Sequence, residues 1–508
     1  MIGDQMAANE TTPTPIVRTY GNFRRPESAG IGRLGMIGTG VLLTGIIIMI
    51  ILMTLRLLLV AVVWGLLLTL ILGLMAVKDQ HGRSGVQRLA TRTGWRSTRA
   101  GSRHLYRSGP LGRTQWGTFQ LPGLLAATTL HEFSDSYARP FAIVETPSVG
   151  HYSIVIGCEP DGASLVDQEQ IDSWVAHWGH WLATLGQETG IVAASVTVET
   201  APDTGARLRR EVNGRIDPNA PELAKQMLHQ VMANYPTGSA QIRAWVALTF
   251  NGRTHSGKRR TVDEMARDLA SRLPSLTQQL SATGAGAARP VGAQALCEVV
   301  RVAYDPASAT IIDDVHASGQ APDLSWSDVG PSAAEASWDT YRHEGAWSRT
   351  WMMSGAPRGE VFSSVLSRLL APSADIDRKR VTIMYRPLDP SRAARTVEQD
   401  KRTSDFRVAS APRPSARAIT SARAANATAA EEARGAGLVD FGMLITATVN
   451  DGSRIPDANA AIENLAATAR LMIRPAYGSQ DSAFTACLPL GLVLPAHMRV
   501  PTEVRNAL

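Results

Sequence analysis

The sequence predicts a membrane helical hairpin followed by a cytoplasmic α+β part. One observation is the apolar run from Gly35 to Val77, in which Arg56 is the only charged side chain. A second is the group of arginines that follows this run. A third is the recurrence of an alternating strand, a charged turn and an amphipathic helix. This recurrence predicts repeated ferredoxin-like β-α-β modules, with helices on one face of mixed sheets.

The hairpin is predicted from the position of Arg56. This residue divides the run into Gly35–Leu55 and Leu57–Val77, each about 31 Å long at ~1.5 Å per residue, which fits one bilayer crossing. At a turn, Arg56 lies at the far interface, where a charge costs little, whereas at the bilayer centre it costs at least ~2.5 kcal/mol. The run is too long for a signal peptide, and a single tilted span with a buried extension is the remaining alternative.

The flanking charges predict the orientation. Arginines lie in the tail, residues 1–34, and in the segment after Val77, whereas the turn holds only Arg56. Because positive charge stays cytoplasmic, we expect a plasma-membrane protein with two helices, whose termini and main domain are cytoplasmic.

The segment 78–115 forms a basic juxtamembrane neck. Its arginines recur at spacings of three and four, which predicts one face of a helix. Such a face attracts anionic lipid headgroups at about 1 kcal/mol per residue. An acidic partner subunit or nucleic acid are the alternatives, and we expect no direct nucleic-acid contact. The predicted membrane-surface or partner contacts are Arg83, Arg88, Arg92, Arg96, Arg99, Arg103 and Arg107.

The composition agrees with this division of the chain. Of 508 residues, 44% are hydrophobic and 19% charged, which excludes a disordered chain and one wholly buried in a membrane. Three widely separated cysteines exclude a disulfide framework and a cysteine zinc motif, and they favour a reducing compartment. The net charge of +6 arises from the neck, since the part after residue 130 is mildly acidic.

The cytoplasmic part is predicted to contain several units. A first α+β domain is expected over 116–290, a second over 291–395, a helical arm over 396–436 and a C-terminal α+β repeat over 437–508. The strand–helix stretches that suggest the modules are Tyr152–Glu199, Ala244–Leu280 and Gly442–Leu494.

Further elements follow from periodicity and from turn-forming residues. We expect a helix over Ala293–Ala303, an apolar helix over Val361–Leu370 and a strand over Arg380–Tyr385. Pro412 and Pro414 predict either that the arm consists of two exposed helices with a hinge or that it is partly mobile. The segments 202–222, 282–292 and 316–336 are predicted to be loops.

No motif for catalysis is complete. Gly252–Lys258 matches the phosphate-binding pattern G-x-x-x-x-G-K, but Arg259 stands where Ser or Thr would bind Mg²⁺. Thr310–Asp314 resembles the apolar strand that accompanies such a loop and ends in an Asp that holds the metal ion. His177 and His180 lack a third metal ligand nearby. We therefore expect no catalytic, cofactor-binding or metal-binding residue and no enzyme activity. The alternative is a membrane-anchored nucleotide-binding enzyme that uses Gly257 and Lys258.

Several segments carry a family resemblance. Tyr20–Pro26 and Leu105–Gly112 resemble actinobacterial integral membrane proteins that are encoded with conjugation-type ATPases. The most specific segments, 345–392 and 442–491, are similar to the N-terminal, non-catalytic domain of type IV secretion ATPases. The hairpin also resembles the small two-helix inner-membrane subunit that is sometimes fused to them. The resemblance implies that this chain provides the membrane hairpin and the non-catalytic platform domain, and that the ATPase is a separate protein.

A weaker resemblance is to the E component of type VII (ESX) translocons, which has two membrane helices and a cytoplasmic α/β domain. We therefore expect a non-enzymatic inner-membrane scaffold of a conjugation or type IV-like secretion apparatus. The expected partners are anionic lipids, a separate ATPase and other membrane subunits in an oligomeric complex. An ESX subunit is the alternative.

Overall fold

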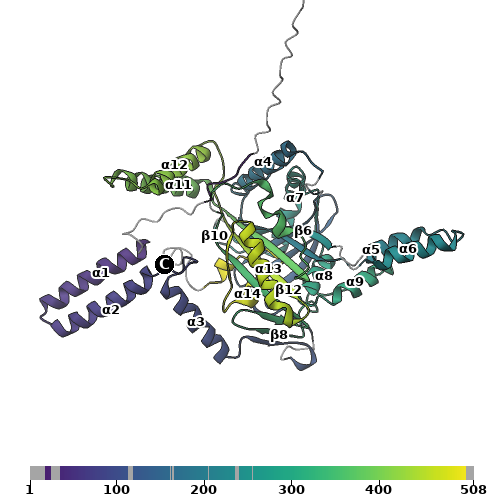
Figure 1. Cartoon of the computed structure of the whole chain (residues 1–508), viewed down its shortest axis with the longest axis horizontal. Helices are drawn as coiled ribbons and strands as arrows, with labels where there is room; N and C mark the ends of the chain where they lie inside the picture. Colours follow the sequence, from purple (N-terminus) through teal and green to yellow (C-terminus); the bar gives the residue numbers. More distant parts are fainter. Residues whose placement is uncertain are drawn as a thin grey trace, which may run out of the picture.

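The computed structural model describes residues 18–23, 35–112, 118–160, 162, 165–203, 205–234, 240–254, 256–357 and 359–498. Its body is organised by one 13-stranded sheet (Figure 1), which confirms the predicted α+β class. The strands are β1 (Leu105–Arg107), β2 (Thr129–Ser134), β3 (Pro140–Thr146), β4 (His151–Glu159), β5 (Ile191–Pro202), β6 (Ala240–Asn251), β7 (Ala287–Pro290), β8 (Ala333–Ala336), β9 (Tyr341–His343), β10 (Ala346–Gly355), β11 (Arg378–Pro387), β12 (Val439–Val449) and β13 (Met472–Pro475).

Fourteen α-helices lie in the described part of the chain. They are α1 (Gly35–Thr54), α2 (Leu58–Ala76), α3 (Gly85–Ala100), α4 (Gln168–Leu185), α5 (Ala206–Arg215), α6 (Glu222–Asn234), α7 (Val262–Ser281), α8 (Ala293–Tyr304), α9 (Ser308–Ala317), α10 (Ser367–Leu370), α11 (Pro390–Ala409), α12 (Ala416–Ala433), α13 (Ile455–Thr468) and α14 (Gln480–Ala486).

The sheet contains two four-stranded groups with the same strand order. One group runs β7-β4-β6-β5 and the other β13-β10-β12-β11, and β5 pairs with β11 to join them. A two-stranded hairpin, β2–β3 or β8–β9, extends the β4 or β10 side of each group. The two halves of the body therefore repeat one topology. The first two strand–helix stretches of the sequence both belong to the first group.

The sheet differs from the prediction of mixed sheets covered on one face. Every pairing between named strands is antiparallel. Helices α4, α7 and α13 each return the chain to a position two strands away, and a third strand fills the gap, whereas α5–α6 and α11–α12 connect neighbouring strands. Neighbouring residues Ile143 and Val144 are both fully buried, on opposite faces of β3. Ile143 belongs to a core with α4 and α7, and Val144 to a core with α8 and α14. A sheet that is apolar on both faces needs helices on both.

The segment that contains α14 packs into the sheet. Thr382 Oγ1 donates to the carbonyl of Cys487 at 2.9 Å, and Thr249 Oγ1 donates to that of Gly491 at 2.6 Å. The Gln480 amide accepts from the backbone N–H of Thr350 and donates to its carbonyl. The apolar stretch Phe484–Leu494 is thus buried against strands of both groups, without forming a strand of its own.

Several local predictions are confirmed and others are wrong. The helix at Ala293–Ala303 is α8, the strand at Arg380–Tyr385 lies within β11, and the two arm helices are α11 and α12. The helix predicted at Val361–Leu370 is reduced to a 3₁₀ turn and the four-residue α10. The segments predicted as loops contain α5, β7 and β8. Strand β7 forms because it pairs with the distant strand β4, and β8 forms because it pairs with the distant strand β1 and with its hairpin neighbour β9.

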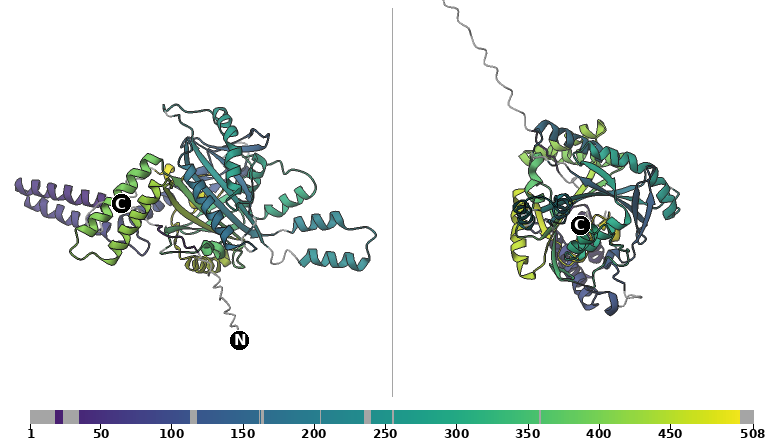
Figure 2. Two further views of the ribbon diagram at one scale, coloured as in Figure 1. Left: turned by 90° about the horizontal axis from the view of Figure 1, so that it is seen from above. Right: turned by 90° about the vertical axis from the view of Figure 1, so that its right-hand side faces the viewer.

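Three pairs of helices, α1–α2, α5–α6 and α11–α12, extend from the body. Helices α1 and α2 project on one side, and α11 and α12 project on the same side (Figures 1 and 2). Helices α5 and α6 project on the opposite side.

Candidate functional site

Helices α1 and α2 present a large apolar surface. They lie side by side (Figure 1), and Trp64 Nε1 of α2 donates to the carbonyl of Gly45 at 3.1 Å. A Cβ at Gly45 would stand 2.5 Å from Leu68 Cδ1, so glycine allows the close approach. The outer faces are exposed leucine, isoleucine and valine, for example Leu59 at 85%. Exposed apolar patches of this size mark a membrane or partner surface.

One described helix, Leu58–Ala76, is long and apolar enough to cross a membrane by length and composition. Gly38–Thr54 is a shorter apolar helix segment. Arg56 lies in the turn between α1 and α2, with a left-handed φ of 57° and an exposed side chain. The chain reverses at the residue that divides the apolar run of the sequence.

Helix α3 carries part of the predicted arginine face. It begins at a capping box, in which Ser84 Oγ accepts from the Gln87 N–H and the Gln87 side chain accepts from the Ser84 N–H. The helix ends at Ala100, so the prediction of one continuous helical face to Arg107 is wrong: Arg103 lies in a turn and Arg107 in β1. Four arginines lie on one side of α3, namely Arg88, Arg92, Arg96 and Arg99.

These four side chains and those of Arg103 and Arg107 are exposed, and none forms an ion pair with a residue in the described ranges. Arg83 differs, because it donates to the Gln87 carbonyl and to Thr91 Oγ1. Burial lowers the pKa of Arg83, and burial together with the charge of Arg83 lowers the pKa of Arg474 to about 10. The α2–α3 junction is thus an electropositive region beside the apolar helices.

Aromatic contacts fix α3 to the body. The Trp95 ring lies 6.1 Å from that of Trp338, which stacks on Tyr477 at 5.5 Å. At the other end, Gly85 packs against α2, where a Cβ would stand 2.9 Å from the Leu74 carbonyl oxygen. Helix α3 therefore holds the apolar helices in a defined pose relative to the sheet, and it runs across their axis (Figure 1).

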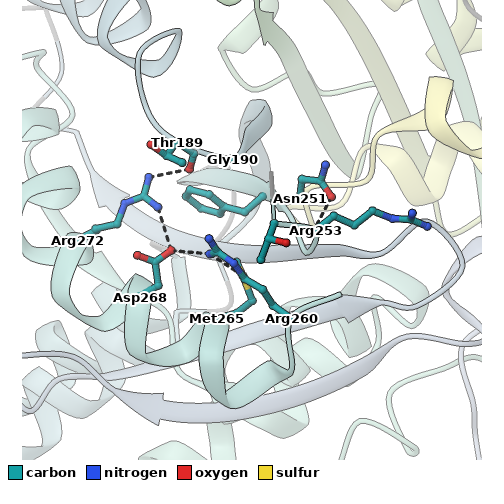
Figure 3. A pocket seen from close by; sticks show the side chains of 10 residues that line it. Thr189, Gly190, Asn251, Arg253, Arg260, Met265, Asp268 and Arg272 are labelled. Atoms are coloured by element: carbon teal, nitrogen blue, oxygen red, sulfur yellow. Dashed lines mark hydrogen bonds and ion pairs between the residues drawn. The ribbon is translucent and has the colours of Figure 1, made fainter. Parts of the chain in front are cut away.

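The loop with the phosphate-binding pattern borders a pocket of about 360 Å³ (Figure 3). Its polar lining includes Arg253, Arg260, Asp268 and Arg272. The loop folds back on itself, since Thr254 N–H donates to the Lys258 carbonyl at 2.8 Å and Lys258 N–H donates to Thr254 Oγ1. A phosphate cradle requires backbone N–H groups that point at the ligand. The N–H groups of Thr254 and Lys258 are instead bonded within the loop.

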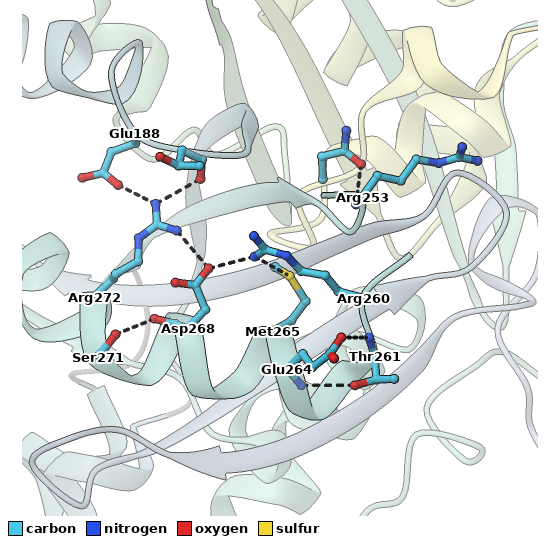
Figure 4. Close-up of polar contacts among 11 residues, drawn as sticks. Glu188, Arg253, Arg260, Thr261, Glu264, Met265, Asp268, Ser271 and Arg272 are labelled. Atoms are coloured by element: carbon cyan, nitrogen blue, oxygen red, sulfur yellow. Dashed lines mark hydrogen bonds and ion pairs between the residues drawn. The ribbon is translucent and has the colours of Figure 1, made fainter. Parts of the chain in front are cut away.

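Charges around the pocket are largely compensated (Figure 4). Asp268 pairs with Arg260 at 3.0 Å and with Arg272 at 3.4 Å, and Arg272 also pairs with Glu188. Helix α7 begins at a capping box of Thr261 and Glu264, which places an acid where a phosphate would bind. These contacts favour a structural role for the loop.

The other chemical motifs do not converge. Thr310–Asp314 lies in α9 and is not the strand that would accompany a phosphate-binding loop. His177 lies on α4, and its Nδ1 is 2.8 Å from the Ser173 carbonyl oxygen. Within the ranges that the structure describes, no three His, Cys, Asp or Glu side chains are grouped for a metal.

A buried charge cluster was missed by the sequence reasoning. Glu199 on β5 pairs with Arg378 and Arg380 of β11 across the junction of the two halves. Burial raises the pKa of Glu199, but the two guanidinium groups outweigh this and lower it from 4.5 to about 2. Arg380 is 1% exposed, and its Nη1 and Nη2 have no hydrogen-bond partner in the structure. Arg378 and Arg380, two residues apart at the start of an apolar strand, were the available signal, but their partner lies on a distant strand.

Comparisons with known proteins bear on the first part of the chain. Residues 27–87 match a family described as a domain of unknown function (DUF8461). The matched range contains α1, α2 and the capped start of α3. A search of curated proteins found no match. The comparisons therefore show similarity to a domain family of unknown function, and this similarity covers α1, α2 and the α2–α3 junction.

Proposed function

We propose that this protein is a non-enzymatic scaffold of a conjugation or type IV-like secretion apparatus, anchored in the inner membrane by α1 and α2. The observation that carries the anchor is the exposed apolar surface of these helices next to the arginines of α3. Membrane insertion would bury that surface at about 25 cal/mol per Å². The resemblance of segments 345–392 and 442–491 to a secretion ATPase platform supports the choice of machine.

In this proposal the two helices form a membrane hairpin with both termini cytoplasmic. The turn at Arg56 would reach the far interface, and α3 would lie along the cytoplasmic surface, since it runs across the axis of α1 and α2. Its exposed arginines would contact anionic headgroups. The α2–α3 junction and the Trp95–Trp338 contact would hold the body against the membrane.

We further propose that each four-stranded group is a ferredoxin-like module of one duplicated unit. The shared order of strands, with α4 and α7 as crossovers in one group and α13 in the other, supports this. Two modules joined edge to edge through β5 and β11 would form one continuous platform for the proposed scaffold.

The docking surface that we propose for a partner ATPase is on α6. Leu223, Met227 and Val231 recur every four residues and are 69%, 60% and 51% exposed. Helix α6, together with α5, projects from the body on the side opposite to α1 and α2 (Figure 2). An apolar stripe on a charged helix is suited to helix-in-groove or helix–helix docking.

A topology experiment tests the anchor. The three native cysteines are buried, so single cysteines at Arg56→Cys and Ser97→Cys report on accessibility. In intact cells, a membrane-impermeant maleimide should label Arg56→Cys and should reach Ser97→Cys only after permeabilisation. Labelling of Ser97→Cys in intact cells, or recovery of the chain outside the membrane fraction, would contradict the proposed topology.

Purification of the full chain in mild detergent tests the partner. Peptide mass spectrometry should identify a secretion ATPase, which is lost with Met227→Asp plus Val231→Asp. The matched control is Gln226→Asp, an exposed position on another side of α6. A stable chain that never captures an ATPase would count against the proposal.

The second candidate is an E-like subunit of a type VII (ESX) translocon. Two apolar N-terminal helices before an α+β body favour it. The two candidates predict different co-purifying ATPases: a type IV-like secretion ATPase for the first, and a membrane-anchored ATPase with three motor domains for the second.

A further inference from the structure

The arm formed by α11 and α12 ends in a tip that is both basic and apolar. Residues 401–423 contain six lysines or arginines and one acid, Asp405. Phe406, at the end of α11, is 71% exposed, and Ile419 of α12 is 37% exposed. Cations next to an exposed aromatic ring are typical of segments that bind the surface of an anionic membrane.

The arm itself is well formed. Ala393, Val397 and Ala425 are buried between its helices or at its base. Asp389 and Ser415 cap α11 and α12 by accepting backbone N–H groups. The large apolar side chains at the tip are therefore not needed to hold the two helices together.

The position of the arm provides the second argument. Helices α11 and α12 project from the body on the same side as α1 and α2 (Figures 1 and 2). Asn22, shortly before α1, donates to Thr428 Oγ1 of α12 at 2.8 Å, and Phe23 packs on Phe441. The described residues Asn22 and Phe23, which precede α1 in the sequence, thus contact the base of the arm.

We infer that the tip of the arm, residues 401–423, binds anionic phospholipid headgroups as a second contact with the membrane. This inference rests on the proposed anchor, because α1 and α2 would bring the tip to the bilayer. With α3 it would give the body two separate lipid contacts, so that the body would be fixed against rotation about the hairpin. The cations would contact phosphate groups, while Phe406 and Ile419 would enter the interface.

The test uses the full chain in nanodiscs, with a fluorophore on Ser410→Cys at the exposed end of α11. The discs contain phosphatidylcholine alone or with phosphatidylglycerol, and the quencher is neutral acrylamide. Phosphatidylglycerol should protect Ser410→Cys from quenching, and salt should reverse this. Replacing Arg407, Arg413, Arg417 and Arg423 by Gln should abolish the protection, because each charge removed lowers the ratio of docked to free tip about fivefold. The control label, Gln230→Cys on α6, should not respond to lipid.

Equal quenching of Ser410→Cys in both kinds of disc would overturn the inference and leave the anchor intact. Protection that survives the four substitutions, or that also appears at Gln230→Cys, would overturn it as well. Protection by an added DNA duplex in neutral discs, without protection by phosphatidylglycerol, would assign the tip to nucleic acid instead. A chain that does not insert into discs would overturn both the anchor and this inference. Unchanged thermal melting of the variant shows that the substitutions leave the fold intact.

Discussion

Glu199 sits where the two halves of the sheet meet, and it is the carboxylate that pairs with both Arg378 and Arg380. All three side chains are less than a tenth exposed. A buried pair need not add stability relative to apolar residues, but loss of one partner leaves a charge without compensation. The junction therefore depends strongly on this one ionised group.

Glu199→Gln should destabilise the body by about 3–5 kcal/mol, because two buried guanidinium groups lose their counter-charge. Thermal melting followed by tryptophan fluorescence measures the effect. Glu398→Gln, which breaks an exposed pair with Arg402, is the control and should change the melting temperature little. Equal effects of the two substitutions would contradict the importance assigned to the junction.

The same group predicts a pH dependence. The folded state lowers the pKa of Glu199 below its ordinary 4.5, so its stabilising contribution is complete above that pH and is lost as the pH falls below it. Wild-type melting temperature should therefore fall more steeply than that of Glu199→Gln as the pH is lowered from 4.5. Parallel curves for the two proteins would refute this.

His343 should make the protein sensitive at a higher pH. Its Nδ1–H donates to the Tyr304 carbonyl and its Nε2 accepts from Ser348, so the buried ring is neutral, and burial lowers its pKa from 6.5 to about 4. The unfolded chain binds a proton between these values and the folded chain does not, so stability falls as the pH drops from 6.5 towards 4. His343→Gln should reduce this slope in melting temperature, while His151, with a pKa also near 4, retains part of it. An unchanged slope would show that His343 does not cause the loss.

At the scale of elements, contacts between helices are set by single small residues. Gly45 and Gly85 let α2 pack closely against α1 and α3. Larger side chains at these positions would separate helices whose arrangement positions the body relative to the proposed membrane.

Gly45→Leu should weaken the pairing of α1 and α2, because its Cβ would overlap Leu68. Gly40→Leu is the matched control in the same helix, where a Cβ meets no atom within 4 Å. Protease susceptibility of the detergent-solubilised chain near the Arg56 turn should rise for Gly45→Leu alone. A similar rise for both would indicate a general effect of leucine in α1.

The sequence predicted elements whose signal is local and missed those that depend on distant partners. Helix α8 has an apolar face of its own, and Pro412 and Pro414 interrupt any helix that contains them. Strand β7 has only four residues and forms because β4 offers an edge. The buried Glu199 cluster was likewise beyond prediction, since no local pattern pairs β5 with β11.

For the whole molecule, the two halves repeat one topology, and each has a core of its own, but a third core is shared between them. The core around Val144 and Val300 of the first half also contains Phe484, Leu488 and Leu490. Without these side chains, the α8 face of the first group would be exposed to water.

A fragment of residues 118–317 should therefore not fold on its own, even though it contains one complete strand group. We expect it to bind a hydrophobic dye and to melt without a cooperative transition, whereas residues 78–508 should melt cooperatively. A monodisperse fragment with a sharp transition would show that the first half is independent.

The buried stretch Phe484–Leu494, which begins in α14, also bears on the synthesis of the chain. At ~5–20 residues per second, Phe484 leaves the ribosome tens of seconds after Val144, its neighbour in the same core. During that interval the sheet remains incomplete, while α1 and α2 would already enter the bilayer in the topology that we propose. Chaperone binding to nascent chains should therefore persist until residues 484–492 emerge, and in the proposed topology the body would mature at the membrane surface.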